Sequence, residues 1–534
     1  MKNIWSSILI TIVMAANTHS QKVNIIPQPN EMKINKGFFT FNRLTISYEA
    51  EATFVANYFL KEIKSISNKR FSIASDQNVE GNQIIFKKEE NLANEEYHLF
   101  IDEKGIQIVA SYPSGWFYGV QSLLQIFHQY ETNRGQTTSL PLLSVKDKPA
   151  FQWRAFMLDE ARHFKGMDQV KLLLDEMAYL KMNVFHWHLV DDQGWRIEIK
   201  KYPLLTKIGS TRKSTQIGPK QWESPIQSGE PHSGFYTQEQ LKEIINYAQE
   251  RFITVVPEIE MPGHSTAAIA AYPWLGTSKR KIEVPIKFGV GKDVYDVTDP
   301  AVYQFLTDVL DEVMDVFPSE VIHIGGDEVK YNHWKNSKSV QRFMKVNDLK
   351  SPADLQVYFT NKISNFLQEK GRRMMGWNEI LGHNLHYFQD KKDTKTTQQL
   401  ATNAVVHFWK GDLELATNAV KNGYDIVNSL HSSTYLDYTY KAISVKKAYE
   451  FNPIPKGLDK KYHSKIIGLG TQMWGEWIPT NGQMHYQVFP RIAAYAETGW
   501  TKASQKNYYR FLLGMPLLQK RWKEKEIYFA NEPK

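Results

Sequence analysis

The sequence predicts an α/β protein in which a small α+β domain precedes a (β/α)8 TIM barrel. With 534 residues, the chain is longer than one ordinary domain. From residue 151 onward, short β-branched or aromatic runs alternate with amphipathic stretches such as 167–180, 237–250, 300–317 and 354–370. The eight strand-like runs are residues 156–160, 183–188, 253–260, 320–328, 373–379, 404–409, 425–429 and 466–476. A doubly wound open sheet is the rival fold, but no glycine-rich dinucleotide fingerprint supports it.

The same patterns divide the chain into four parts. We expect a signal peptide at 1–20, the α+β domain at 22–148, the barrel at 151–505, and a helical extension packed on the barrel at 506–534. Within the α+β domain, alternating residues around a Glu-Lys-Gly turn predict a hairpin over 97–110, and helical spacing follows at 114–130.

The N-terminal residues have the pattern of a secretory signal. Lys2 supplies a positive start, residues 4–16 are apolar, and the small residues Thr18 and Ser20 precede Gln21. We therefore expect cleavage near Ser20 and a periplasmic or secreted protein. No other segment approaches the ~20 apolar residues of a transmembrane helix, so no membrane anchor is expected.

Composition removes several classes of function. The chain has no cysteine, which rules out disulfides, thiol catalysis and cysteine-ligated zinc. Its net charge is +8, but the lysines and arginines are scattered, and 279–281 is the densest short run. Without a basic stripe or a nucleic-acid motif, a solvated basic surface is the better interpretation, and no nucleic-acid partner is expected.

Two adjacent acids, Asp327 and Glu328, end the fourth run. In a barrel, the C-terminal ends of all strands meet at one face, where the active site forms. Most glycosidases place two carboxyls on opposite sides of the bond, about 5–5.5 or 6.5–9.5 Å apart. Neighbouring residues, with Cα atoms only about 3.8 Å apart, can hardly straddle a sugar. Gly325 and Gly326 can adopt backbone angles that let both acids approach one ligand.

Seven stretches, in order along the chain, resemble the family 20 glycoside hydrolases, the β-N-acetylhexosaminidases. They are MLDEARHF (157–164), HWHLVDDQGWR (186–196), PEIEMPGH (257–264), HIGGDEV (323–329), GWNE (376–379), YLD (435–437) and WGE (474–476). The resemblance covers most of residues 22–500. It implies an exo-acting enzyme that removes terminal β-linked N-acetylglucosamine or N-acetylgalactosamine from glycans, without a metal or another cofactor.

The resemblance also implies a retaining, substrate-assisted mechanism, in which the acetamido oxygen attacks C1 and forms an oxazolinium ion. Glu328 is then the general acid and base, while Asp327 holds the acetamido N–H and balances the ring charge. We expect repulsion between the two acids to keep Glu328 protonated near neutral pH. The expected substrate-binding residues are Arg162, Asp191, His264, Trp377, Trp409, Tyr435, Asp437, Trp474 and Glu476, with Asp191 and His264 forming a relay towards Glu328.

Other interpretations remain open at this point. His186 and His188 form an H-x-H pair of the kind that metal-dependent amidohydrolase barrels use, so a metal-dependent amide hydrolase or sugar deacetylase is the alternative. The pair lies on the second strand, where histidines packed in the barrel mouth are the simpler explanation. A catalytically silent carbohydrate-binding relative is a third hypothesis. Glu260 and Asn378 stand where the family often has Asp, which affects fine specificity more than activity.

Overall fold

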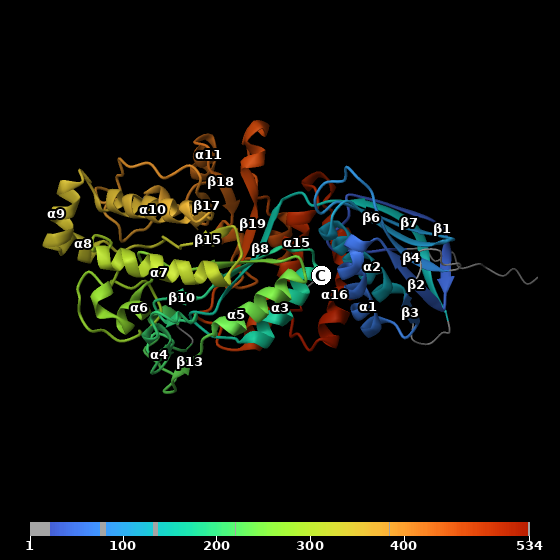
Figure 1. The fold of residues 1–534 in the computed structure, drawn as a ribbon, viewed down its shortest axis with the longest axis horizontal. Helices are drawn as coiled ribbons and strands as arrows, with labels where there is room; N and C mark the ends of the chain where they lie inside the picture. Colours follow the sequence, from blue (N-terminus) through green and yellow to red (C-terminus); the bar gives the residue numbers. More distant parts are fainter. Residues whose placement is uncertain (1–21, 75–81, 132–136, 219–220, 384, 532–534) are drawn as a thin grey trace, which may run out of the picture.

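The computed structural model describes residues 22–74, 82–131, 137–218, 221–383 and 385–531. The expected signal peptide at 1–20 lies outside the described residues. Figure 1 shows two domains joined end to end, with the N-terminal sheet on one side and the barrel on the other.

The N-terminal domain is a seven-stranded mixed sheet with the strand order β1-β7-β5-β6-β4-β2-β3. The helices α1 (Thr53–Ile66) and α2 (Pro113–Tyr130) lie on the side of the sheet that faces the barrel (Figure 1). The predicted hairpin is the antiparallel pair β5 and β6, and the predicted helix is α2. The strands are β1 (Glu31–Phe41), β2 (Arg43–Tyr48), β3 (Arg70–Ile73), β4 (Gln83–Lys88), β5 (Tyr97–Asp102), β6 (Gly105–Ala110) and β7 (Thr138–Asp147).

The second domain is a closed barrel of eight parallel strands, which confirms the predicted fold class. Seven of the predicted runs each contain one strand, while β8 begins three residues before the run predicted at 156–160. The barrel closes where β19 pairs with β8. The strands are β8 (Trp153–Asp159), β9 (Val184–His188), β14 (Thr254–Glu258), β15 (Val321–His323), β16 (Arg373–Trp377), β17 (Val405–Phe408), β18 (Asp425–Asn428) and β19 (Ile466–Met473).

Helices surround the barrel, and several begin with a capping side chain. Thr237 forms a reciprocal capping box with Gln240 at α5, while Asp299 and Ser351 cap α7 and α10 just before a proline. The longer helices are α3 (Met167–Tyr179), α5 (Gln238–Gln249), α7 (Pro300–Val316), α10 (Pro352–Glu369), α11 (Leu413–Lys421) and α15 (Arg491–Trp500). Shorter elements within the connections are β10 (Val190–Asp191), β11 (Gly194–Trp195), α4 (Leu204–Lys207), β12 (Thr211–Arg212), β13 (His232–Ser233), α6 (Thr266–Ala271), α8 (Asn332–Asn336), α9 (Lys338–Val346), α12 (His431–Thr434), α13 (Val445–Glu450) and α14 (Asn481–Val488).

The barrel interior has an apolar lower layer and, nearer the C-terminal ends of the strands, a polar upper layer. The lower layer is Ala155, Val184, Val256, Val321, Met375, Val405, Val427 and Ile467. Because side chains on one face of a strand recur every second residue, the next inward positions lie two residues further along each strand. They include His186, Glu258, His323, Trp377 and His407, all buried. The strands therefore change from apolar to polar as they approach their C-terminal ends.

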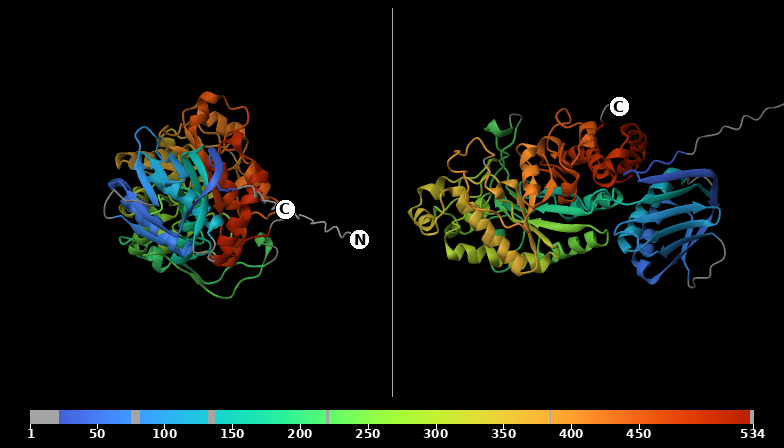
Figure 2. Two further views of the ribbon diagram at one scale, coloured as in Figure 1. Left: turned by 90° about the vertical axis from the view of Figure 1, so that its right-hand side faces the viewer. Right: turned by 90° about the horizontal axis from the view of Figure 1, so that it is seen from above.

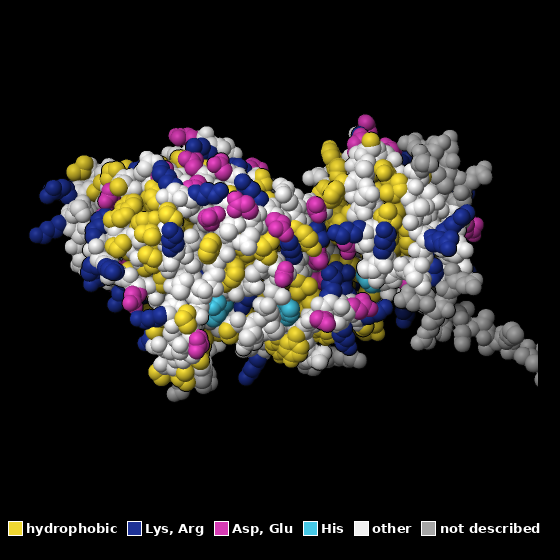
Figure 3. All heavy atoms as spheres, turned by 60° about the horizontal axis from the view of Figure 1, so that its bottom comes forward, with side chains coloured by type: hydrophobic (Ala, Val, Ile, Leu, Met, Phe, Trp, Pro, Cys, Tyr) yellow, Lys and Arg dark blue, Asp and Glu magenta, His cyan; other side chains and the backbone are white. Residues whose placement is uncertain are grey.

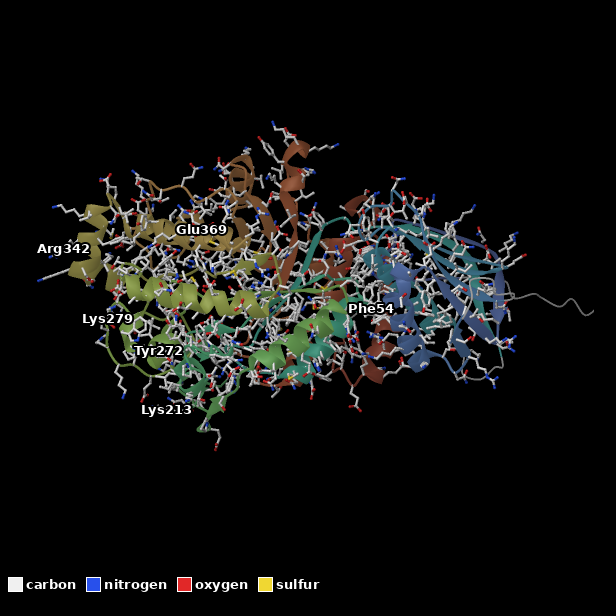
Figure 4. All side chains as sticks on the ribbon, viewed as in Figure 1. Phe54, Lys213, Tyr272, Lys279, Arg342 and Glu369 are labelled. Carbon is white, nitrogen blue, oxygen red and sulfur yellow. The ribbon has the colours of Figure 1, made fainter. Side chains whose placement is uncertain are left out.

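The last helix, α16 (Tyr508–Glu524), lies at the boundary between the two domains (Figure 2). Arg521 and Trp522 both donate to Glu176 of α3, and Arg510 donates to the backbone oxygen of Ile25. Close by, the ring of Phe54, labelled in Figure 4, meets Phe252 of the barrel edge to face at 6.4 Å. These contacts join both domains and the C-terminal helix.

On the molecular face shown in Figure 3, lysine and arginine side chains are interspersed with aspartate and glutamate. None of the helices in the described part of the chain is both long enough and apolar enough to cross a membrane.

Candidate active site

A cavity of about 550 Å³ opens at the C-terminal ends of the barrel strands. Of the expected site residues, the cavity brings together Arg162, His264, Asp327, Glu328, Trp409, Tyr435, Asp437, Trp474 and Glu476. Asp191 and Trp377 lie behind this surface. The convergence follows from the barrel itself, because strands far apart in sequence end at one rim.

The short strand β15 turns sharply into the two adjacent acids. Gly325 and Gly326 have φ values of +65° and +91°, and Glu328 itself has a φ of +53°. This left-handed backbone is open to glycine and costs other residues energy, which makes Glu328 a strained position. The turn brings both carboxylates towards His264, whose Nε2 lies 3.6 Å from Asp327 and 3.7 Å from Glu328.

His264 lies between the acid pair and two buried carboxylates. Its Nδ1 lies 3.1 Å from Asp191 and 3.2 Å from Asp192. Although burial opposes the charge, Asp191 and Asp327 raise the pKa of His264 well above its usual range. These surroundings favour the imidazolium form of His264, which lies between two pairs of acids.

Asp327 has an unusual acidity. Burial raises its pKa to about 7, opposed by the attraction of His264 and reinforced by the negative charges of Glu379 and Glu328. One carboxylate oxygen, Oδ1, is buried and accepts no hydrogen bond from the described residues. Asp327 is thus a buried acceptor that lacks a donor.

Arg162 is held rigidly at the cavity wall. Its Nε donates to Gln193, and its two terminal nitrogens contact Asp159 at 3.1 Å and Asp191 at 2.7 Å. These contacts engage three of the five guanidinium N–H groups, so two remain for a ligand. The half-buried acids Asp437 and Glu476 line the same cavity, and partial burial raises the pKa of both.

Three of the expected aromatic residues line the cavity: Trp409, Tyr435 and Trp474. Trp409 stacks on Tyr435 with ring centroids 6.0 Å apart, and Trp474 lies 5.9 Å from Tyr435. Trp377, expected beside them as a third wall, is buried behind the two indoles, 5.8 Å from Trp474, and donates to Glu258. It belongs to the polar upper layer of the barrel because its strand position points inward.

The histidine pair belongs to that same layer. Glu258 accepts from Nδ1 of His188 at 2.6 Å and lies 2.9 Å from His186 and 3.0 Å from His323. These three histidines lower the pKa of Glu258 well below its usual value despite burial. All four residues are buried and none lines the cavity, so a metal held here would not meet a substrate. The contacts support a structural role for the H-x-H pair rather than the hydrolytic metal site of an amidohydrolase.

The two residues that depart from the family pattern have different surroundings. Glu260 is buried directly against the acid turn, and burial raises its pKa well above the usual value, with Asp327 and Glu258 adding to the rise. Asn378 accepts from the backbone N–H of Trp409 at 3.0 Å and donates to the backbone oxygen of Lys410 at 3.0 Å. An aspartate could not make the second bond when ionised.

Sequence reasoning missed one side of the cavity. His386 lies 3.4 Å from Glu328 and 2.7 Å from Glu379, which also accepts from the indole of Trp409. Lys330 and Lys410 line the cavity as well. Glu379 ends the run at 373–379 and Lys410 directly follows the run at 404–409, which was the available signal. His386 lies in an irregular connection, where no periodicity marks it.

Comparison with known proteins agrees with this geometry. The model of glycosyl hydrolase family 20, catalytic domain, matches residues 151–503, and the model of domain 2 of the same family matches residues 22–148. The β-hexosaminidase of Porphyromonas gingivalis is 36% identical over 513 residues, covering 92% of this chain and 62% of that protein. The β-hexosaminidase of Vibrio furnissii is 32% identical, covering 90% and 77%. The chain thus spans less than two thirds of the Porphyromonas protein.

Two solved structures match this fold over most of the chain. The exo-β-N-acetylglucosaminidase of Vibrio harveyi, solved with N-acetylglucosamine, superposes with a TM-score of 0.81 at 30% identity, covering 95% of this chain and 78% of that one. The chitobiase of Flavobacterium johnsoniae gives 0.79 at 32% identity, covering 95% and 73%.

Proposed function

Because the chain belongs to glycosyl hydrolase family 20, we propose that it removes terminal β-linked N-acetylhexosamines from the non-reducing ends of glycans. The observation that carries the proposal is the placement of Asp327 and Glu328. Their carboxylate oxygens and His264 all lie within 4.8 Å of one another, and both acids approach the same imidazole nitrogen. This closeness supports an arrangement in which both carboxylates approach a bound sugar from the same side.

A substrate-assisted mechanism fits this arrangement. The acetamido oxygen of the substrate attacks C1 while Glu328 protonates the leaving oxygen, which opens the glycosidic bond. Asp327, whose Oδ1 lacks a donor, accepts the acetamido N–H and balances the oxazolinium charge. Glu328 then takes a proton from the water that attacks C1, and the product leaves with retained β configuration. The N–H groups of Arg162 and the carboxyls of Asp437 and Glu476 suit the sugar hydroxyls.

The first test compares two nitrophenyl glycosides at saturation, one with the 2-acetamido group and one with a 2-hydroxyl. An intramolecular nucleophile can have an effective molarity up to roughly 10⁵–10⁸ M, so kcat is expected to collapse on the 2-hydroxy substrate. Equal kcat values would instead point to a protein nucleophile, such as Asp437 or Glu476. A thiazoline analogue of the oxazolinium should also bind much more tightly than the product sugar.

The second test replaces the acid. Glu328→Gln is expected to lower the rate on a disaccharide by about 10²–10⁴-fold. Bond cleavage with a nitrophenyl leaving group, which departs without a proton, should fall much less. The exposed Glu103→Gln is the matched control.

Full activity in the presence of a chelator is expected, whereas loss of activity with recovery by zinc would favour the amidohydrolase alternative.

We also propose export of the protein by the segment at 1–20, on the strength of its charged, apolar and small-residue pattern. Fractionation of expressing cells should recover the mature chain from the periplasm or the medium. Recovery of the intact chain from the cytoplasm would contradict this.

A further inference from the structure

The side of the cavity next to Glu328 carries basic residues. Nδ1 of His386 lies 3.4 Å from Glu328 Oε1, and Nζ of Lys410 lies 3.1 Å from the same Nδ1. Lys330, two residues after Glu328, lines the cavity with them. Because Glu328 protonates the leaving oxygen in the proposed function, this basic side faces the leaving group.

Neither lysine forms an ion pair within the described parts of the chain. Lys330 donates to the backbone oxygen of Val290 at 2.9 Å, and Lys410 contacts His386. Each ammonium has three N–H donors, so two on each remain for a ligand. Both side chains are half-buried. A partly desolvated cation with unused donors is stabilised when an anion joins it.

The two lysines differ in position from the residues proposed to bind the terminal sugar, Arg162, Asp437 and Glu476. Lys410 contacts His386, which lies beside Glu328, and Lys330 follows Glu328 by two residues. Asn378 fixes the backbone of Lys410 through both bonds of its amide. Nζ of Lys330 lies 5.3 Å from the ring of Phe388, another cavity residue. Both cations are thus held in place rather than free in solvent.

We propose that the leaving-group subsite, formed by Lys330 and Lys410, selects a sugar that carries an anionic group, a carboxylate or a sulfate. This specificity rests on the proposed function and narrows its substrate class to acidic glycans. Phe388 and the fully exposed ring of Tyr387, both at the cavity, supply apolar surface for the sugar ring itself.

Three disaccharides with β-1,4-linked N-acetylglucosamine test the proposal. The second sugar is glucuronic acid, glucose 6-sulfate or glucose, so only the group at C6 differs. We expect kcat/KM on at least one of the charged substrates to exceed that on the glucose compound about 10-fold, the effect of one charge-assisted hydrogen bond. The better charged substrate identifies the anion. The advantage should shrink as salt is raised, because the subsite is partly open to solvent.

Variants assign the effect to the subsite. Lys330→Met and Lys410→Met should each lower the ratio of charged to neutral kcat/KM, while Lys410→Arg should retain most of it. Lys446→Met removes one exposed charge on α13 and should leave the ratio unchanged, which controls for long-range steering. If Lys410 merely tuned Glu328, its replacement would lower all three rates equally and the ratio would stay constant.

Equal rates on the three disaccharides, or a preference for glucose, would overturn the proposal. So would an anion preference that survives both lysine replacements. Turnover of an aryl N-acetyl-β-glucosaminide distinguishes failure of this specificity proposal from failure of the proposed function. Turnover of the aryl substrate without an anion preference removes only the inference, whereas no turnover of any substrate removes the proposed function.

Discussion

At the scale of single residues, Asp327 shows how the barrel changes an ordinary side chain. The pKa of its carboxyl is raised to about 7, while the expected protonation of Glu328 stays a prediction. The physical reason is burial, because Asp327 is 8% exposed and burial disfavours its charged form. A substrate N–H at this carboxylate favours the ionised form again, so ligand binding and proton release are linked.

This linkage predicts the pH dependence of the reaction. Below about pH 7, Asp327 in the free protein takes up a proton and becomes neutral. A neutral carboxyl cannot balance the oxazolinium, so kcat/KM should fall as pH decreases through 7, approaching tenfold per unit. The corresponding fall in kcat should occur at lower pH, because bound substrate stabilises the anion. Rate profiles on an aryl substrate measure both, and a constant kcat/KM from pH 7 to 5 would contradict the assignment.

At the scale of elements, the critical unit is the turn after β15. The strand itself has only three residues in the sheet, and the chain then enters left-handed backbone at Gly325 and Gly326. Glu260, from the segment after β14, packs into the space that the absent side chain leaves. A Cβ added at Gly325 would lie only 1.7 Å from Glu260 Oε2. Glycine at position 325 therefore permits both the left-handed backbone angle and the close packing of the Glu260 side chain.

Gly325→Ala is expected to lower kcat/KM by about 10²-fold or more, because displacing the acid turn by about 1 Å disrupts catalytic geometry. Gly371→Ala is the matched control. Its φ is +72°, but an added Cβ there meets no atom within 4 Å, so it adds the same backbone strain without the clash.

Adding Glu260→Asp to Gly325→Ala should recover part of the activity, because the shorter side chain withdraws from the added methyl group. Steady-state rates of the single and double variants measure this. If the double variant is no better than Gly325→Ala, then backbone strain rather than the clash with Glu260 causes the loss.

At the scale of the whole molecule, a buried charge pair joins the two domains. Asp147, at the end of β7, accepts from Tyr97 at 2.8 Å, Lys181 at 3.1 Å and Trp500 at 2.9 Å. Lys181 and Trp500 belong to the barrel domain, and the pair of Asp147 with Lys181 is fully buried. Breaking one partner of such a pair leaves a buried charge alone.

Asp147→Ala is therefore expected to destabilise the protein by about 3–5 kcal/mol, the usual loss when one member of a buried pair is removed. Adding Lys181→Met removes the orphaned charge and should restore much of the stability. Thermal unfolding measures both variants. Glu283→Ala is the control, because its pair with Lys213 is 76% and 68% exposed, and no measurable change is expected. A loss in Asp147→Ala no larger than in the control would contradict the role of the pair.

The sequence by itself determined the barrel and most of its site. Strands buried in a barrel are short apolar runs that end in polar residues, and eight such runs with helices between them specify the fold before any contact is known. Residues that follow strand ends meet at the rim of a barrel. The site residues of this kind are the acid pair, Arg162, Trp409 and Trp474. The order of residue types along the chain was enough for these predictions.

Only the tertiary structure decided which side chains face the cavity and which charges stay unpaired. Trp377 ends β16 and Trp409 directly follows β17. Yet Trp377 points into the barrel and Trp409 lines the cavity, a difference of register that depends on neighbouring strands. His386, Lys330 and Lys410 come together from separate connections without periodicity. Burial, which sets the acidity of Asp327, is a property of the packed molecule, because it depends on residues distant in sequence that exclude water from the site.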